Sequence, residues 1–312
     1  MKTVLICSPY APLDYILEGL HLPDVSVVRL KKPARGLLPS LLRGLCRWTG
    51  LSARCHRLFF AAETNRQLTA LSRSTGPMRA IIIDAKRPVW LSILPKVLPP
   101  QCERHLYFWT PVQAIYHRLS PRRLQHRLQS LSRLYHLSSF NPDDRRLCPA
   151  LQFRTQFFRL LPPGPEASQP LAWFVGQDKG RSALLAHCRR LLESQGVACD
   201  FVVVRKGERG LSYRECMERA ARSTLIVDIT LGQNGLSLRP MEALYLGKKL
   251  LTNNADIRQC DFYHPDNIFI LGVDSEDRLS SFLQSSMATT SAAIRQRYDI
   301  NTWVEGFAHP AE

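Results

Sequence analysis

Short runs of apolar, often β-branched residues recur along the chain and alternate with stretches whose apolar residues have helical spacing. Several runs are apolar without interruption, such as Ile81–Ile83 and Phe201–Val204. That is the pattern of a strand covered by helices on both faces. The expected strands are Lys2–Cys7, Val25–Val28, Ala80–Asp84, His105–Trp109 and Tyr135–Leu137 in the first half, and Trp173–Gly176, Phe201–Val204, Leu225–Asp228, Lys249–Thr252 and Ile268–Leu271 in the second. The alternation predicts an α/β fold with parallel sheets built from βαβ units.

A Pro-rich segment divides the two sets of strands. Residues 161–170 contain four prolines, so they continue neither a helix nor a central strand, and we interpret them as a linker. The sequence thus predicts an N-terminal Rossmann-like domain over residues 1–160 and a C-terminal Rossmann-like domain over residues 171–312. Because ligands of open α/β sheets bind beyond the carboxyl ends of the strands, we expect a central cleft that both doubly wound domains face.

The composition is that of a folded protein, with 45% hydrophobic and 22% charged residues. No run of about 18 apolar residues predicts a membrane-spanning helix. The apolar start of the chain is interrupted by Pro9 and Asp14, so we interpret it as a strand rather than a signal peptide. The nine cysteines lack CxxC spacing and the nine histidines lack ligand spacing. This argues against a disulfide framework and a zinc site, and favours a reducing cytoplasm.

The positive charge lies in the first half. Residues 1–160 carry 25 Lys and Arg against 8 Asp and Glu, a net +17, whereas residues 161–312 carry 17 against 18, a net −1. This asymmetry predicts an anionic partner for the first half, either a nucleic acid or an anionic lipid surface.

Two segments of the first half mix arginine with leucine. Residues Leu37–Arg57 contain Trp48 and no acidic residue, and Arg118–Arg133 has arginines and leucines at helical spacing. Such segments suit an element lying on an anionic membrane. The alternative is two ordinary amphipathic helices that pack their leucines inward.

The first chemical motif follows the strand at Trp173. Gly176, Lys179, Gly180 and Arg181 form a Gly-bearing turn that leads into the helical pattern Ser182–Ser194. Backbone N–H groups at a helix start bind anions, and a bound anion offsets the unfavourable placement of cations there. The alternative is an ordinary βα turn with two solvated charges.

A second loop of the same kind follows the strand Leu225–Asp228. Gly235 would let the backbone approach a phosphate closely, and Pro240 suits the first turn of the next helix. We place Glu242 in that first turn, where its carboxylate could accept the hydroxyls of a ribose. Its alternative role is helix capping, which contributes about 0.3–1 kcal/mol.

The stretch Gly235–Asn254, together with residues 174–181 and 261–270, resembles the donor-binding region of retaining GT-B glycosyltransferases of the bacterial lipopolysaccharide and capsule biosynthesis type. The resemblance covers about 130 residues of the second half. It implies a loop that contacts diphosphate and donor sugar and a Glu that holds the ribose. The donor-binding residues it implies are Gly176, Gly180, Gln233, Gly235, Leu236, Ser237 and Glu242. One position departs from the family: Asn234 stands where a second Glu usually contacts the sugar.

The resemblance also implies a mechanism. Lys179 and Arg181 would stabilise the leaving diphosphate, with Asn234 at the donor sugar and no metal or cofactor. The donor phosphate would act as base and the configuration would be retained. The implied partners are a nucleotide sugar, a saccharide or lipid-linked acceptor and the inner face of the cytoplasmic membrane, where the enzyme would be peripheral.

Three residues near strand ends in the first half are candidates for acceptor binding, namely Tyr10, Asp84 and Trp109. The aromatic rings could stack on a sugar or belong to the core, and Asp84 could instead cap the next helix. Two other functions stay open. A non-catalytic GT-B-like protein would explain Asn234, and a basic nucleic-acid-binding protein would explain the charge. We expect no nucleic acid, because no RNA- or DNA-binding motif is recognisable.

Overall fold

The computed structural model describes residues 1–33, 36–48, 54–84, 87–165, 169–205, 207–231 and 235–308. The chain forms two compact units. Unit 1 comprises Met1–Tyr10 and His21–Arg154, and unit 2 comprises Ala11–Leu20 and the chain from Thr155 on. These units differ from the predicted domains in two places. The segment Ala11–Leu20 belongs to unit 2, and the second boundary lies at Thr155 rather than in the Pro-rich segment, so that residues 155–160 also belong to unit 2.

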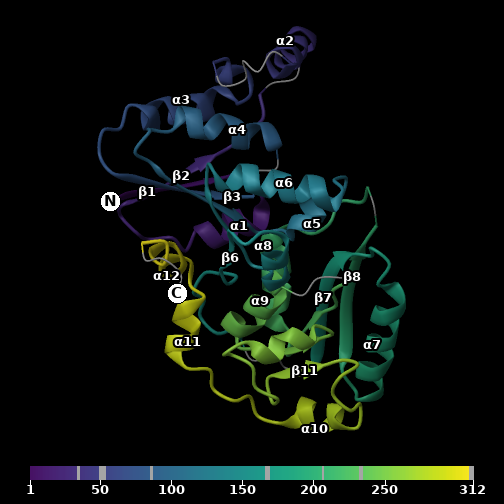
Figure 1. The fold of residues 1–312 in the computed structure, drawn as a ribbon. Helices are drawn as coiled ribbons and strands as arrows, with labels where there is room; N and C mark the ends of the chain where they lie inside the picture. Colours follow the sequence, from purple (N-terminus) through teal and green to yellow (C-terminus); the bar gives the residue numbers. More distant parts are fainter. Residues whose placement is uncertain are drawn as a thin grey trace. The chain divides into compact units, whose positions relative to one another are not determined.

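The described part of unit 1 has one parallel sheet of six strands in the order β2-β1-β3-β4-β5-β6. Its helices α3, α4 and α6 cover one face, where Leu68, Leu94 and Leu128 are buried against the strands (Figure 1). The strands are β1 (Lys2–Cys7), β2 (Val25–Arg29), β3 (Met78–Ile83), β4 (Glu103–Phe108), β5 (His136–Ser139) and β6 (Leu151–Phe153), and the helices are α2 (Leu37–Trp48), α3 (Ala62–Ser72), α4 (Pro88–Val97), α5 (Val112–Ile115) and α6 (Pro121–Ser132).

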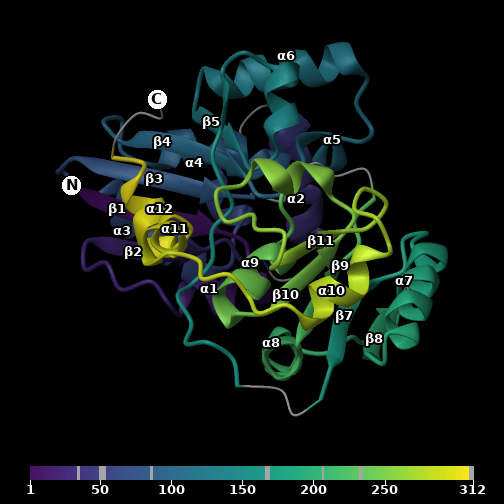
Figure 2. The ribbon, with the colours of Figure 1, turned by 90° about the horizontal axis from the view of Figure 1, so that it is seen from below.

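The described part of unit 2 has a parallel sheet of five strands in the order β11-β10-β9-β7-β8. The strands are β7 (Leu171–Gln177), β8 (Ala198–Val204), β9 (Leu225–Asp228), β10 (Lys249–Thr252) and β11 (Ile268–Ile270), and the helices are α1 (Ala11–Leu17), α7 (Ser182–Ser194), α8 (Tyr213–Arg222), α9 (Leu238–Leu246), α10 (Arg278–Gln284), α11 (Ala292–Arg297) and α12 (Ile300–Glu305). Helices α7 and α10 pack on one face through Leu192 and Phe282. Helix α8 lies on the side of β7 and β8 opposite to α7 (Figures 1 and 2).

Aromatic and ionic contacts hold α1 in unit 2. The ring of Tyr15 packs edge-on against Tyr213, with the ring centroids 5.3 Å apart. The carboxylate of Glu18 accepts hydrogen bonds from Arg159 at 2.8 Å and from Arg214 at 2.9 Å. Since these partners are far away in the sequence, the local pattern of residues 11–20 does not reveal the unit to which the helix belongs.

The fold class predicted from the sequence is confirmed, because both units are parallel, doubly wound α/β sheets. In unit 1 the strand order reverses beside β1, which lies between β2 and β3. In unit 2 it reverses beside β7, which lies between β8 and β9. Each reversal opens a crevice at the carboxyl ends of two neighbouring strands, which is the place where open α/β sheets bind ligands.

All ten expected strands are present, and β6 is an additional short strand. No helix in the described ranges has both the length and the apolar character needed to cross a bilayer.

Candidate functional site

Two arginines join the predicted loops at the crevice between β7 and β9. The guanidinium of Arg181, which follows β7, donates to the backbone carbonyl of Ile229, the residue after β9. Arg239 in the first turn of α9 donates back to the carbonyl of Val175 in β7. The turn after β7 and the start of α9 therefore form one site within unit 2.

Both guanidinium groups pack over the ring of Phe174. The Cζ atoms of Arg181 and Arg239 lie 5.7 Å and 5.4 Å from the ring centroid. A Cβ atom at Gly176 would lie 3.3 Å from Cζ of Phe174 and 3.5 Å from a guanidinium nitrogen of Arg239. Glycine at this position thus leaves room for the Phe174 ring on which Arg239 packs. Burial, followed by the charge of Arg239, lowers the pKa of Arg181. An anion bound here would offset the repulsion between the two cations.

A buried carboxylate lies beside the two arginines. Asp228 ends β9 and is 1% exposed. It accepts hydrogen bonds from the hydroxyls of Ser237 at 2.9 Å and Thr252 at 3.5 Å. Burial raises its pKa, while Arg239 and Arg181 act in the opposite direction. The hydroxyl of Ser237 also caps α9 by accepting from the N–H of Arg239 at 3.2 Å. Ser237, predicted to bind the donor, thus holds the start of α9 in this structure.

Glu242 lies in the second turn of α9, not in the first as predicted, because the helix begins at Leu238. A helix-capping role is therefore ruled out, since capping acts on the first turn. The carboxylate is 7% exposed, and its Oε1 accepts a 2.8 Å hydrogen bond from the hydroxyl of Tyr213. Burial raises the pKa of Glu242, and the nearby charge of Arg239 lowers it in part. Glu242 lies three residues after Arg239 in α9, so the two side chains are neighbours on the helix surface.

The turn Asp178–Arg181 has the geometry of a type I′ turn. Lys179 and Gly180 have φ values of 47° and 86°, and the N–H of Arg181 donates to the carbonyl of Asp178 at 2.9 Å. The carboxylate of Asp178 accepts from both the backbone N–H and the hydroxyl of Ser182. Since a carboxylate already occupies the start of α7, the cationic side chains are the main groups that this turn offers to a phosphate.

The remaining donor-site candidates lie in the loop before α9. Gly235 is buried, and the carbonyl of Leu236 accepts a 3.3 Å hydrogen bond from the side chain of Gln156. Gln233 and Asn234 lie outside the described residues.

The three acceptor candidates of unit 1 come together at the carboxyl ends of β1, β3 and β4. The carboxylate of Asp84 accepts from the backbone N–H of Trp109 at 2.9 Å and from the hydroxyl of Thr110 at 2.6 Å. The ring of Tyr10 packs edge-on against Trp109 with the centroids 5.9 Å apart. Tyr10 is 46% exposed and Trp109 is 8% exposed, so of the two rings Tyr10 offers the larger surface to a ligand.

Asp84 does not cap the next helix, because α4 begins at Pro88 with Arg87 in the cap position. Its backbone has a φ of 40°, in the left-handed region that favours glycine. Asp tolerates this conformation better than most residues. The two hydrogen bonds to its carboxylate explain why it is held there, beside the crevice between β1 and β3.

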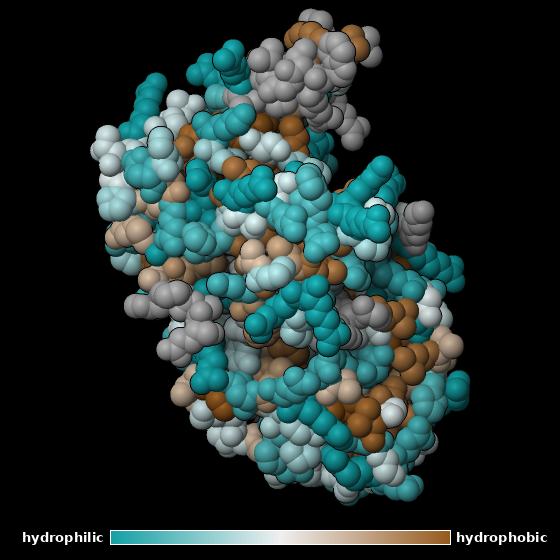
Figure 3. Space-filling model, viewed as in Figure 1, coloured by the Kyte–Doolittle hydropathy of each residue, from teal (hydrophilic) through white to brown (hydrophobic). Residues whose placement is uncertain are grey.

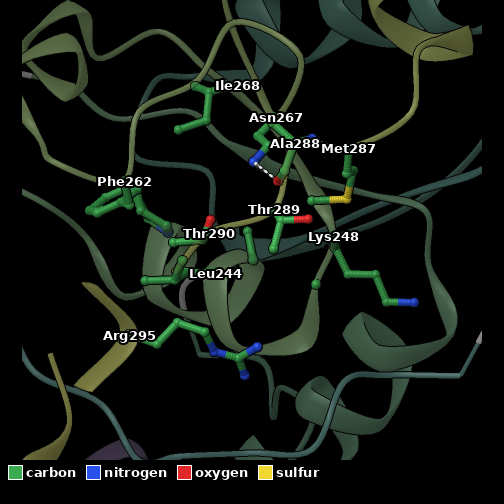
Figure 4. A pocket seen from close by; sticks show the side chains of 13 residues that line it. Leu244, Lys248, Phe262, Asn267, Ile268, Met287, Ala288, Thr289, Thr290 and Arg295 are labelled. Atoms are coloured by element: carbon green, nitrogen blue, oxygen red, sulfur yellow. Dashed lines mark hydrogen bonds between the residues drawn. The ribbon is translucent and has the colours of Figure 1, made fainter. Parts of the chain in front are cut away.

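A separate pocket of about 260 Å³ lies along the outer face of α9 (Figure 4). Its lining includes Ala243 and Leu244 of α9, Gly247 after the helix, and Phe262 and Thr290 from later segments. Of the predicted site residues that the structure describes, none lines this pocket. Among the same described residues, no group of three or more His, Cys, Asp and Glu side chains is placed to hold a metal ion.

Sequence reasoning missed Arg239, Asp228 and Tyr213. A signal for Arg239 exists, because a cation in the first turn of a helix opposes the helix dipole, as at the start of α7. Asp228 carries a weaker signal, since it ends an apolar run at the carboxyl edge of the sheet. Tyr213 has no local sequence signal, because its partner Glu242 lies 29 residues further along the chain in a different helix.

No protein-family model matches the sequence, and a search of curated proteins finds no match. Among solved structures the chain is similar to an alpha-glucosyltransferase in complex with UDP and a 13-mer DNA containing a HMU base, at 11% identity over 97% of this chain and 93% of that chain, with a TM-score of 0.48. It is similar to HepE from Anabaena in complex with UDP and glucose, at 11% identity over 99% and 98% of the two chains, with a TM-score of 0.47. It is also similar to sucrose-phosphate synthase from Thermosynechococcus elongatus, at 11% identity over 97% and 91%, with a TM-score of 0.44. Likeness at this level does not place the chain in a family.

Proposed function

We propose that this protein is a glycosyltransferase that moves a sugar from a nucleotide sugar to a saccharide acceptor. One observation carries the proposal: Arg181, Arg239 and Glu242 gather at the point where the strand order of unit 2 reverses. A pair of guanidinium groups matches the charge and geometry of a diphosphate. The carboxylate of Glu242 accepts one hydrogen bond from Tyr213 and has further lone pairs that can accept hydrogen bonds from ribose hydroxyls.

In the proposed reaction, the arginine pair neutralises charge that develops on the leaving diphosphate. The bond between the anomeric carbon and the β-phosphate oxygen breaks, and a bond from that carbon to the acceptor oxygen forms. The acceptor hydroxyl passes its proton to an oxygen of the departing diphosphate. Attack from the face that the diphosphate leaves retains the configuration. The step needs no metal ion, because Arg181, Arg239 and Lys179 supply the cationic charge.

The acceptor and the location belong to the same proposal. A lipopolysaccharide, capsule or other lipid-linked acceptor agrees with the resemblance of residues 235–254 and with the net charge of the first half. Tyr10 and Asp84 are the proposed acceptor contacts in unit 1. An enzyme with such an acceptor would work in the cytoplasm, peripheral to the inner face of the cytoplasmic membrane.

Thermal-shift measurements against a panel of nucleoside diphosphates and nucleotide sugars test the donor site. A ligand present at a hundred times its Kd stabilises a folded unit by about 2.7 kcal/mol, so a rise in Tm of several degrees is expected for at least one of them. Arg181→Ala and Glu242→Ala should reduce the shift. Arg190→Ala, which removes an exposed arginine from α7, should not. No shift with any ligand would contradict the proposal.

Release of UDP or GDP in the presence of candidate saccharide acceptors separates an enzyme from a non-catalytic relative. Turnover that needs both donor and acceptor supports the proposed reaction. Binding without release would favour a non-catalytic GT-B-like protein. RNA binding that falls steeply with salt, without any response to nucleotide sugars, would favour the nucleic-acid-binding protein.

A further inference from the structure

The two arginine- and leucine-rich segments of unit 1 have different structures. In α6 the leucines pack inward, since Leu124, Leu128 and Leu131 are 5%, 0% and 1% exposed. In α2, Leu41 and Leu45 lie on the surface and are 65% and 54% exposed. The prediction of an ordinary amphipathic helix therefore holds for α6. Helix α2 exposes apolar side chains at Leu41, Leu42 and Leu45.

The exposed leucines of α2 form one surface. Leu41 and Leu45 are one helical turn apart, and Leu42, which is 40% exposed, lies beside them. Figure 3 shows apolar side chains at the surface of this helix. Contacts elsewhere on α2 attach it to unit 1, because Cys46 is buried in the core and the guanidinium of Arg43 donates to the carbonyl of Leu58 at 3.4 Å. Leu41 and Leu45 thus lie on the side of the helix away from this attachment, and Leu42 lies at the border between the two sides.

The charge around this face is positive. Residues 31–62, which include α2, contain seven Lys and Arg and no Asp or Glu. Unit 1 as a whole carries 24 Lys and Arg against 6 Asp and Glu, a net +18. An apolar helix face within a cationic segment is typical of helices that lie in the interface of an anionic bilayer.

We infer that α2 docks the protein on an anionic lipid surface by inserting Leu41, Leu42 and Leu45 among the acyl chains. Two copies of a unit with net charge +18 repel each other, so the charge disfavours a second copy as the occupant of this face. A nucleic acid would match the charge but would leave the leucines exposed. The inference does not depend on sugar transfer, because lipid binding is measured without any donor or acceptor.

Co-sedimentation of the full chain with lipid vesicles tests the inference. We expect binding to vesicles that contain phosphatidylglycerol, and binding at least about tenfold weaker to pure phosphatidylcholine, because several cations contribute near an anionic surface. The double variant Leu41→Asp/Leu45→Asp should weaken binding to the anionic vesicles by about tenfold or more. The milder Leu41→Ser/Leu45→Ser should weaken it in the same direction.

Leu134→Asp is the matched control, because Leu134 is 39% exposed in unit 1 outside α2. It should leave vesicle binding unchanged, and circular dichroism should show all variants folded. Equal binding to both vesicle types, no binding to either, or equal loss in Leu134→Asp would overturn the inference. The inference would also be wrong if the protein formed an oligomer without lipid and the α2 substitutions dissociated that oligomer. A failure here would leave the donor-site proposal untouched, since the thermal-shift response to nucleotides involves residues of unit 2.

Discussion

The hydroxyl of Tyr213 donates a 2.8 Å hydrogen bond to Oε1 of Glu242 and thereby joins the first turn of α8 to the second turn of α9. The ring of Tyr15 packs against Tyr213 from α1. A buried glutamate has several rotamers, and this bond selects the one in which its carboxylate lies near the Arg239 charge. Tyr213 is therefore a positioning residue for the proposed ribose contact.

Replacing Tyr213 by Phe should weaken the affinity for a nucleoside diphosphate by about five- to tenfold and lower stability by about 1–3 kcal/mol, because a buried acceptor loses its donor. Isothermal titration calorimetry and urea unfolding measure the two effects. Tyr298→Phe is the control, since Tyr298 also donates to a carboxylate of unit 2, that of Asp261, at 2.7 Å. If both variants bind nucleotide equally well, the positioning role is wrong.

Glu242→Gln should stabilise the ligand-free protein. It should also remove the contribution of this carboxyl group to the pH dependence of stability. Burial raises the pKa of Glu242 above its ordinary 4.5, so the folded chain holds this proton more tightly than the unfolded chain. Stability therefore falls as the pH rises from about 4.5 through the pKa of the folded state. The variant lacks this loss, so its advantage over the natural protein should grow from pH 5 to pH 7.

Urea unfolding of both proteins at the two pH values measures this difference, and calorimetry should show weaker nucleotide binding by the variant. Asp228 also has a raised pKa but is present in both proteins, so its contribution cancels in the comparison. An advantage of the same size at pH 5 and pH 7 would contradict the assignment of the pH dependence to Glu242.

The secondary structure was largely predictable because hydrophobic periodicity is a local signal. The strands Leu225–Asp228 and Lys249–Thr252 and the helix Ser182–Ser194 have the predicted bounds. Strand β6 was not predicted, since three residues at a sheet edge carry too little pattern. The alternative role of Asp84, capping the next helix, is wrong for a different reason. Its carboxylate accepts instead from the backbone N–H of Trp109, the residue that follows the neighbouring strand β4.

The long-range part of the candidate site could not be predicted. Gly176 and Arg181 could be predicted from the local sequence, because glycines and cations directly after a strand indicate an anion site at the carboxyl edge of a parallel sheet. The contact of Arg239 with Val175 spans 64 residues and depends on how α9 packs on the sheet. The placement of Tyr15 in unit 2 depends on packing between α1 and α8, which no periodicity along residues 11–20 encodes.

Lys179→Gly should separate stability from ligand binding. Lys179 has a φ of 47°, a conformation that costs a non-glycine residue about 1 kcal/mol. Glycine relieves this strain, so we expect a variant that is as stable as the natural protein or more stable by up to about 1 kcal/mol. Its nucleoside diphosphate affinity should fall about threefold or more, because one exposed cation is lost.

Lys179→Ala is the matched comparison, because it removes the same charge but keeps a Cβ atom in the strained conformation. Urea unfolding should find it less stable than Lys179→Gly, while calorimetry finds the same affinity for both. Unchanged affinity in both variants would show that the lysine does not contact the ligand.

Gly176→Ala should disturb the arginine pair without removing a charge. The new Cβ atom would lie 3.3 Å from Cζ of Phe174 and 3.5 Å from the guanidinium of Arg239. The contact with Phe174 is the tight one, so the buried ring must move by a few tenths of an ångström, and the Arg239 guanidinium that packs over it should shift with it. We expect a loss of about 1 kcal/mol in stability and a weaker nucleoside diphosphate affinity, similar to that of Arg239→Ala. Gly76→Ala is the control, since no atom lies within 4 Å of a Cβ added there.

A double-mutant cycle decides whether Gly176 acts through Arg239. If the alanine weakens binding by displacing the guanidinium, it has little further effect once Arg239 is already Ala, and the two losses in binding free energy are not additive. Calorimetry with one nucleoside diphosphate on the natural protein, the two single variants and the double variant measures the coupling. Losses that add within experimental error would mean that Gly176 serves the ligand directly, through close approach of its own backbone, and that Arg239 is not displaced.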